Sequence, residues 1–446
     1  MRYLSGKDRQ GAIRAARRLG RLQADRARVP LEYALEHGEP GVRLAAAAAL
    51  GALGRRASRR PLERTLAHPN YHIRAQAAYA LSRIPDPRSA PVLTKILGED
   101  ASALVRNAAA IALGRIGDPR AIPVLGRSLD DESDRVRREA IIALERSGDP
   151  TVTTKVRRFL RDPARRVRIA ATLVLGIRRD ADAVPEMLAL LGRADVWEIP
   201  AILIALGRIG TPECGEALAR SAGHPARWVR VCALQGLSEM RAPQSLEVAR
   251  SRLGDPAWAV RGAAALALGR GGGPTDGGLL LPLLADSSGW VRRAAIYGLG
   301  QIGASEAASQ IRPALADSDP EVRLAAIWAC GVLEDEFSVP ALARMLGRAS
   351  PRGGAHARTL AEGDGAVRLV SDADARRFGA LVQALAQISR ARGNDEARRA
   401  LVSARTRVRE TELDRPARLP SPLGPGVGTA TLRSLFDGVV DGGEGG

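Results

Sequence analysis

The sequence predicts an all-α protein, a right-handed α-solenoid (an α-α superhelix) of about eleven helix-turn-helix repeats, each of about 31 residues. The motif Val-Arg-x-Ala-Ala-x-x-Ala-Leu-Gly is complete at residues 105–114. Its first residue, which we call the anchor, recurs at this nearly fixed period with one double step. A fixed period of this size is typical of a stacked repeat array. The anchors are Val42, Ile73, Val105, Val136, Val167, Val229, Val260, Val291 and Val322.

Each repeat is expected to contain an outer and an inner helix. Residues 136–144 are apolar at too many positions for a surface helix, which indicates an inner helix wedged between neighbouring repeats. In the preceding segment, 121–129, Ile122, Leu125 and Leu129 fall at helical spacing, which indicates an amphipathic outer helix. The Gly-Asp-Pro sequences at 117–119 and 148–150 predict the turns, because Gly permits a left-handed helix stop and Pro starts a helix.

The repeats are expected to fill residues 31–347, after a basic N-terminal cap helix within residues 1–30. The cap presents one charged face made of Arg14, Arg17, Arg18 and Arg21. The next inner-helix pattern, at 378–386, comes late, so we interpret residues 348–376 as an inserted surface loop and 377–414 as a degenerate C-terminal repeat and cap. The Pro- and Gly-rich residues 415–446 predict a disordered tail.

The net charge of +18 makes nucleic acid a candidate partner, since basic proteins bind phosphates by releasing counterions. Residues 1–60 are the basic end, with 14 Arg or Lys against 5 Asp or Glu. However, only Lys7, Lys95 and Lys155 are lysines, and such an arginine bias beside abundant Ala and Gly is also typical of GC-rich coding. Nucleic-acid binding is therefore the weaker alternative to protein binding.

The sequence contains no apolar run long enough to span a membrane, and its first residues do not resemble a signal peptide. Its three cysteines form no CxxC pair, and their odd count suits reduced thiols. We therefore expect a cytoplasmic protein without membrane contact.

A second regularity pairs an acid with an arginine around each anchor. Asp or His stands five residues before the anchor, and Arg stands one residue after it. Together with the Ala-rich helix and the Asp-Pro turns, this pair resembles the HEAT repeats, especially the short-period subgroup named after phycocyanobilin lyase subunits. The resemblance implies that the pairs stack into a structural ladder between repeats. The ladder residues are Asp100, Arg106, Asp131, Arg137, Asp162, Arg168, Asp255, Arg261, Asp286, Arg292, Asp317 and Arg323.

One repeat departs from this pattern. One period after Val167 the anchor slot holds Glu198, and in this repeat Arg193 occupies the acidic slot and Ile199 the arginine slot. Both ladder residues are thus expected to be missing, which predicts a weaker junction at residues 193–200.

No common enzyme motif is present: there is no phosphate-binding Gly-x-x-x-x-Gly-Lys-Ser/Thr loop, no Gly-x-Ser-x-Gly elbow and no His-Glu-x-x-His helix. The deoxyhypusine hydroxylases, which share this repeat type, ligate iron through His-Glu pairs, and none of the five histidines here precedes a Glu. We therefore expect no catalytic residue, no metal site and no cofactor.

Tryptophan and arginine collect at the turn before the inner helix. Because these residue types dominate the binding energy of many interfaces, we predict a partner-binding surface there. The alternative is that each Trp only covers a neighbouring turn. The predicted surface consists of Arg135, Arg166, Trp197, Trp228, Trp258 and Trp290.

A second arginine column, Arg83, Arg115 and Arg146, stands at the C-terminal ends of inner helices. The helix macrodipole suffices to explain cations there, but a basic surface that includes the cap arginines is the alternative.

These patterns predict a non-catalytic scaffold or adaptor that binds unidentified protein partners. A nucleic-acid-binding protein is the first alternative. Bilin lyase-like handling of a chromophore or its acceptor protein is the second, and aromatic residues along the concave face would favour it.

Overall fold

The computed structural model describes residues 9–22, 25–240, 243–348, 372–405, 416–418 and 429–431. These residues confirm an all-α solenoid, and they contain eleven successive pairs of an outer and an inner helix. The chain divides into two compact units, Met1–Thr211 and Pro212–Gly446.

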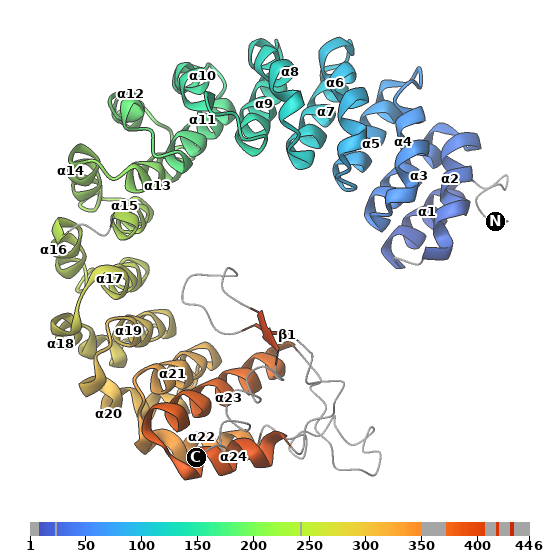
Figure 1. Cartoon of the computed structure of the whole chain (residues 1–446). Coiled ribbons are helices and arrows are strands. Elements are labelled where there is room, and N and C mark those ends of the chain that lie inside the picture. Colours follow the sequence, from blue (N-terminus) through green and yellow to red (C-terminus); the bar gives the residue numbers. More distant parts are fainter. Residues whose placement is uncertain are drawn as a thin grey trace, which may run out of the picture. The chain divides into compact units, whose positions relative to one another are not determined.

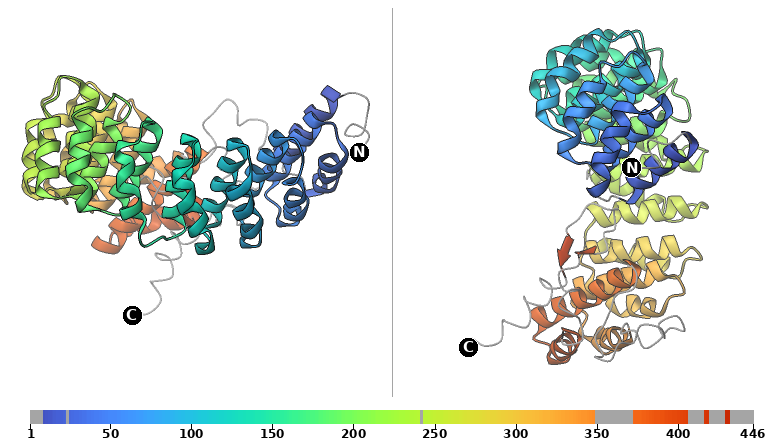
Figure 2. Two further views of the ribbon diagram at one scale, coloured as in Figure 1. Left: turned by 90° about the horizontal axis from the view of Figure 1, so that it is seen from above. Right: turned by 90° about the vertical axis from the view of Figure 1, so that its right-hand side faces the viewer.

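The first unit contains six helix pairs and one preceding helix. Its odd-numbered helices form the inner row and its even-numbered helices the outer row (Figure 1). Successive inner helices lie side by side (Figure 2). The helices are α1 (Arg9–Leu22), α2 (Arg28–His37), α3 (Pro40–Leu53), α4 (Arg59–Thr65), α5 (Tyr71–Ser82), α6 (Ala90–Glu99), α7 (Ala103–Ile116), α8 (Ile122–Arg127), α9 (Asp134–Arg146), α10 (Val152–Val156), α11 (Arg165–Ile177), α12 (Val184–Leu191) and α13 (Ile199–Ile209).

The second unit contains five helix pairs, one further helix and two short strands. The strands pair antiparallel, with Pro416 opposite Thr431. The elements are α14 (Pro212–Ser221), α15 (Arg227–Met240), α16 (Pro243–Ser251), α17 (Trp258–Gly271), α18 (Gly277–Leu280), α19 (Gly289–Gln301), α20 (Ala308–Ile311), α21 (Pro320–Val332), α22 (Val339–Arg348), α23 (Asp372–Arg392), α24 (Asp395–Arg405), β1 (Pro416–Arg418) and β2 (Thr429–Thr431).

Small residues allow the inner helices to pack closely. A Cβ atom added to Gly176 in α11 would lie 2.7 Å from the Cβ of Ala205 in α13, and one added to Gly114 in α7 would lie 2.9 Å from the Cβ of Ala143 in α9. The helices therefore approach nearly backbone to backbone, at the short end of the usual packing range. The anchors and the motif leucines are buried between them, and they form the core of each unit.

The turns follow the predicted chemistry. Gly117 ends α7 in the left-handed conformation, with φ of 68°, and Gly148 has φ of 73° in the next repeat. Asp118 then accepts a hydrogen bond from the backbone N–H of Arg120, which caps the 3-10 turn that starts the next outer element. At this turn Gly117 and Asp118 thus satisfy backbone groups that the helix ends leave free.

Three sequence expectations about element boundaries need correction. The outer helix expected over 121–129 is instead a short α-helix, α8, between 3-10 turns at Pro119–Ala121 and Ser128–Asp130. Such 3-10 turns are common at helix ends. Helix α23 begins at Asp372, inside the loop expected over 348–376, of which residues 349–371 lie outside the described part. Strands β1 and β2 fall in the segment expected to be disordered, whose other residues from 419 to 428 and 432 to 446 are likewise outside it.

Among the described helices, none combines the length and the apolar character needed to cross a membrane.

Candidate binding surfaces

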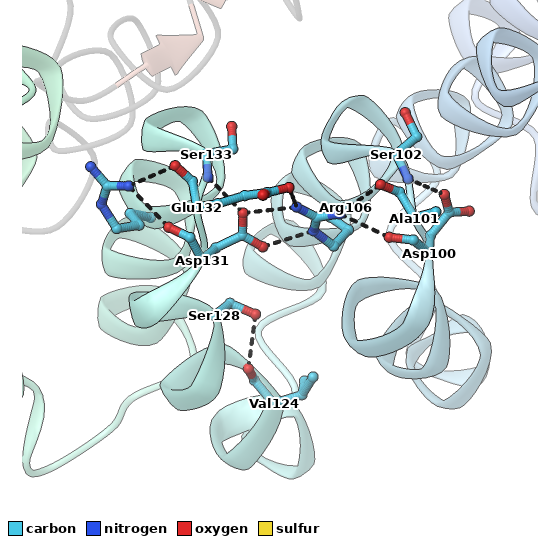
Figure 3. A network of polar contacts seen from close by, with 10 residues as sticks. Asp100, Ala101, Ser102, Arg106, Val124, Ser128, Asp131, Glu132 and Ser133 are labelled. Carbon is cyan, nitrogen blue, oxygen red and sulfur yellow. Dashed lines mark hydrogen bonds and ion pairs between the residues drawn. The ribbon is translucent and has the colours of Figure 1, made fainter.

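Most ladder arginines link two consecutive repeats, as Arg106 shows (Figure 3). Its Nη1 donates to the carbonyl oxygens of Asp100 and Ala101, in the turn before its own helix, at 2.9 and 3.0 Å. Its Nε and Nη2 donate to the two carboxylate oxygens of Asp131, in the next repeat, at 2.7 and 3.0 Å. Asp131 also accepts the backbone N–H of Ser133, which fixes the turn that carries it. The pair therefore joins one turn to the next.

The same two-point contact recurs through both units. In each case the arginine reaches the acid of the following repeat with Nε and Nη2, and both side chains are largely shielded from solvent. Arg323 differs from the others: among the described residues its only hydrogen-bond partners are the carbonyl oxygens of Asp317 and Ser318. The repeated pairs are Arg74–Asp100, Arg137–Asp162, Arg230–Asp255, Arg261–Asp286 and Arg292–Asp317. These arginines are occupied by structural bonds.

The repeat that begins near Glu198 was expected to lack both ladder residues, but Glu198 itself provides the acid. Arg168 donates to the carboxylate of Glu198, at the anchor slot, at 2.7 and 3.0 Å. Asp195 accepts the backbone N–H of Trp197 and so replaces the ladder aspartate in the turn. The prediction of a missing acid was therefore wrong, because the longer Glu side chain reaches the guanidinium from a different register. Ile199 in the arginine slot ends the ladder of the first unit.

Histidine replaces the acid at the first rung. His68 accepts the backbone N–H of Asn70 through Nδ1 at 3.0 Å, as the aspartates do at their turns. Burial and the nearby guanidinium groups of Arg43 and Arg74 lower the pKa of His68. Where the following repeat offers His68 in place of an acid, Arg43 donates to the carbonyl oxygens of Gly38 and Leu35.

A second acidic column was not identified from the sequence. The aspartates of the turns before the outer helices are buried and paired with nearby basic side chains; for example, Arg157 holds Asp180 and Arg312 holds Asp335. The signal was available, because Asp86, Asp118, Asp149 and Asp180 recur at the repeat period. This column is also structural.

The structure separates the predicted tryptophan surface into exposed and packed residues. Trp197 is 70% exposed in the first unit, and Trp258 is 51% exposed in the second. Trp228 and Trp290 are less exposed, and both are half-buried. The ring of Trp290 covers Gly262, and the guanidinium of Arg293 lies 4.5 Å from its centre.

The arginines at the same turns are exposed. Arg135 extends from the N-terminal end of α9, and Arg166 from that of α11, where it pairs with Asp134 at 3.1 Å. Of the predicted partner-binding set, Trp197, Trp258, Arg135 and Arg166 therefore remain accessible in their own units.

The arginines at inner-helix C-termini contact the preceding helix. Arg83 donates to the carbonyl oxygen of Gly51 at 3.3 Å, and Arg115 donates to that of Ser82 at 3.4 Å. Their guanidinium groups thus satisfy free carbonyl groups at helix ends, as the macrodipole argument requires. Both side chains, and that of Arg146, are nevertheless exposed. In α1 the predicted charged face, Arg14, Arg17, Arg18 and Arg21, is also exposed, whereas Ala16 is buried.

From the sequence, Ile142 was expected to be wedged between neighbouring repeats, whereas Tyr79 was expected to support the tryptophan surface. Both belong to a row of apolar side chains on the inner helices that reaches solvent. It lies six residues after the anchor slot. Tyr79 and Leu173 are 41% and 38% exposed, and the other members are half-buried. We call this set, Tyr79, Ile111, Ile142, Leu173 and Ile204, the apolar row.

In the part of the chain that the structure describes, no group of three or more His, Cys, Asp or Glu side chains could hold a metal ion. Cys214 and Cys330 are buried and Cys232 is half-buried. Burial, together with the charge of Asp335, raises the pKa of Cys330 to about 12, so its thiol remains protonated.

No curated protein sequence gives a significant match to this chain. Among solved structures, the complex of CpcE and CpcF of phycocyanin lyase from Nostoc sp. PCC7120 is 25% identical over 55% of this chain and 89% of that one, with a TM-score of 0.33. Human deoxyhypusine hydroxylase is 19% identical over 59% of this chain and 97% of its own, with a TM-score of 0.25.

A larger structural neighbour is Kap95p, solved with RanGDP. It is 14% identical over 98% of this chain and 65% of its own length, with a TM-score of 0.52, and it shares the fold.

The family model for HEAT repeats matches residues 2–82, 30–113, 59–145, 127–199, 200–269 and 278–361. These matches cover most of the chain, and they coincide with the helix pairs and the arginine ladder described above. The chain therefore belongs to the HEAT repeat family.

Proposed function

We propose that this protein is a non-catalytic scaffold that binds protein partners through the exposed aromatic and arginine side chains of its repeats. The observation that carries the proposal is the exposure of Trp197 and Trp258 at the turns before inner helices. Exposed Trp costs solubility without stabilising the fold, and it is the residue type most enriched among interface hot spots. The ladder arginines are excluded from this role because they are bonded within the fold.

The proposal is tested by affinity capture with the full chain in lysate of the source cells, with and without nuclease. We expect partner proteins that remain bound after nuclease treatment. Their yield should fall at least about tenfold with Trp197→Ala and Trp258→Ala combined, because a hot-spot Trp contributes more than the free energy of a tenfold affinity change. The control is Phe337→Ala, which removes an exposed aromatic ring elsewhere. Equal capture by the double variant and the wild type would contradict the proposal.

Nucleic-acid binding is a second candidate, which the exposed arginine face of α1 favours. It predicts weak, sequence-independent and steeply salt-dependent binding centred on residues 1–60. The nuclease arm of the capture experiment separates the two functions, since partners bridged by nucleic acid are released. The lyase-like alternative would be favoured by an aromatic lining, whereas the apolar row of the first unit is mainly aliphatic and has Tyr79 as its one aromatic member.

A further inference from the structure

We propose that the exposed face of inner helices α5, α7, α9, α11 and α13 binds an acidic segment of a partner protein that carries regularly spaced apolar side chains. The inference rests on the proposed protein-binding function and adds a second surface and the chemistry of its ligand. All five helices belong to the first compact unit.

The apolar row forms the centre of this face. Its members occupy the same position in five consecutive inner helices, and close contacts such as Gly114 against Ala143 and Gly176 against Ala205 hold neighbouring helices together. At the usual helix spacing of roughly 8–10 Å, the row extends over roughly 35 Å. Ile177, 52% exposed, widens it at α11. Apolar side chains that reach solvent at the same position of consecutive helices are typical of an interaction surface, whereas isolated exposed apolar residues are not.

Arginines border the row along the C-terminal ends of the inner helices. Arg83, Arg115 and Arg146 are exposed and Arg208 is half-buried. Arg83 and Arg115 bond only to neutral carbonyl oxygens. Within the described residues, no carboxylate lies at ion-pair distance from any of the four guanidinium groups.

The acids on the same face are already neutralised. Asp134 pairs with Arg166, Glu145 with Arg178 at 2.6 Å, and Glu139 with its neighbour Arg138. Burial raises the pKa of Glu139, against the opposing effect of nearby arginines including Arg146 and Arg115. The face therefore keeps an excess of positive charge beside its apolar centre, which is complementary to a ligand that is both acidic and apolar.

The composition of the row favours a peptide over nucleic acid. Proteins that bind single strands without sequence preference combine basic grooves with aromatic rings on which the bases stack, and proteins that bind duplexes contact mainly phosphates. Here four of the five central residues are aliphatic, and aliphatic side chains gain free energy by covering other apolar side chains. In the second unit the same position holds Gln235, Leu266, Tyr297 and Trp328, with Tyr297 buried, so the exposed aliphatic strip belongs to the first unit.

The test is selection of a random phage-displayed peptide library on the immobilised full chain. We expect the selected peptides to be enriched in both Asp or Glu and Leu, Ile or Phe. A synthetic peptide of the consensus should bind about tenfold more weakly to Leu173→Ser, which removes an apolar contact, and to Arg146→Glu, which reverses one bordering charge. Matched controls are Leu279→Ser, at a leucine that is 46% exposed in α18, and Arg127→Glu, on exposed outer helix α8; both should bind as the wild type does.

Circular dichroism first establishes that the four variants keep the helical content of the wild type, as expected for exposed sites. A basic consensus, the absence of any enriched sequence, or equal weakening by test and control variants would overturn the proposal. So would binding of a fluorescein-labelled single-stranded DNA oligonucleotide that Leu173→Ser abolishes. If the library gives no peptide while lysate partners still depend on Trp197 and Trp258, this inference fails and the proposed function stands.

Discussion

At the residue scale, an arginine at the start of most inner helices provides both a local and a long-range contact. The Nη1 of Arg106 donates to carbonyl oxygens in the turn of its own repeat, and its Nε and Nη2 donate to the carboxylate of Asp131 in the next repeat. The planar guanidinium suits this task because its donors diverge in fixed directions, which a lysine ammonium cannot reproduce. The chain has only three lysines, and none of them occupies a ladder position.

Removing one partner of a shielded pair should be costly. We expect Arg137→Ala to destabilise the first unit by about 3 kcal/mol, because Asp162 would be left buried without its counter-charge. The control is Arg161→Ala, which breaks an exposed pair with Glu186 and should cost less than about 1 kcal/mol. Urea denaturation followed by circular dichroism measures both. Similar shifts for the two variants would show that the ladder pairs behave as ordinary surface ion pairs.

The buried aspartates predict a loss of stability in acid. The Arg88 guanidinium lowers the pKa of Asp86 from 3.8 to about 2, and Arg292 lowers that of Asp317. Since these pKa values are lower in the folded state, the unfolded chain takes up more protons in acid. The stabilisation is therefore complete above about pH 4 and is lost as the pH falls toward about 2.

Thermal denaturation between pH 4 and pH 2 checks this expectation. The melting temperature of the wild type should fall steeply over that range, and Asp86→Asn should show a shallower dependence. Asp130→Asn, at an exposed carboxylate, should follow the wild-type slope. Parallel profiles for Asp86→Asn and the wild type would rule out a contribution from Asp86.

Sequence spacing was sufficient to locate the recurring acid and arginine positions, and the resemblance to HEAT repeats implied that they form a ladder. It could not identify Glu198 as the partner of Arg168, since that acid comes from a different register and only the fold brings the two together. Nor could it show that the apolar row is accessible. Hydropathy does not distinguish Leu144, which is buried between helices, from Leu173, which lies where the same packing opens to solvent.

At the element scale, the close spacing of the inner helices depends on Gly and Ala at their contacts. Gly176 in α11 and Ala205 in α13 leave no space for one additional methyl group. The benefit is a large contact area and a rigid spacing between consecutive repeats. The cost is intolerance to enlargement, because a packed interior cannot absorb extra volume without moving its backbone.

We therefore expect Gly176→Ala to destabilise the first unit by about 1–3 kcal/mol, despite the better helix propensity of Ala. Gly126→Ala in α8 is the matched control, since nothing lies within 4 Å of its added methyl group. That variant should be neutral or slightly stabilising. Urea midpoints of the two variants decide the matter, and a stabilised Gly176→Ala would mean that α11 and α13 can separate without loss.

At the scale of the whole molecule, the repeat period predicted the number of helix pairs but not where the array divides. The sequence hypothesis placed a weak junction at residues 193–200. The structure ties α13 to α11 there through Arg168–Glu198 and through Gly176 against Ala205, and the division into compact units comes later, after Thr211. A single missing ladder residue is visible in the sequence, whereas a boundary depends on the sum of all contacts across it.

The division predicts two unfolding steps, because a repeat array is cooperative only across its interfaces. Hydrogen exchange in increasing urea should give different midpoints for peptides from 103–146 and from 289–332. Leu144→Ala leaves a cavity at a fully buried site and should reduce the free energy of unfolding of the first unit by about 2–5 kcal/mol. Only the midpoint of the first unit should therefore fall. Arg127→Ala, at an exposed side chain of α8, should change the free energy of unfolding of either unit by less than about 0.5 kcal/mol. If both midpoints move together in Leu144→Ala, the chain unfolds as one unit.

The arginine ladder also gives the array a direction. A repeat with a complete ladder offers a guanidinium toward its C-terminal neighbour and a carboxylate toward its N-terminal neighbour, as Arg106 and Asp131 do. A duplicated repeat inserted between two others would find both complementary groups already in place, so the array can lengthen without redesign of any joint. The ladder is interrupted at Ile199, and Arg323 meets only carbonyl oxygens among the described residues, yet helix pairs continue beyond both positions. At these two joints the repeats are therefore held by helix packing rather than by the head-to-tail ion pair.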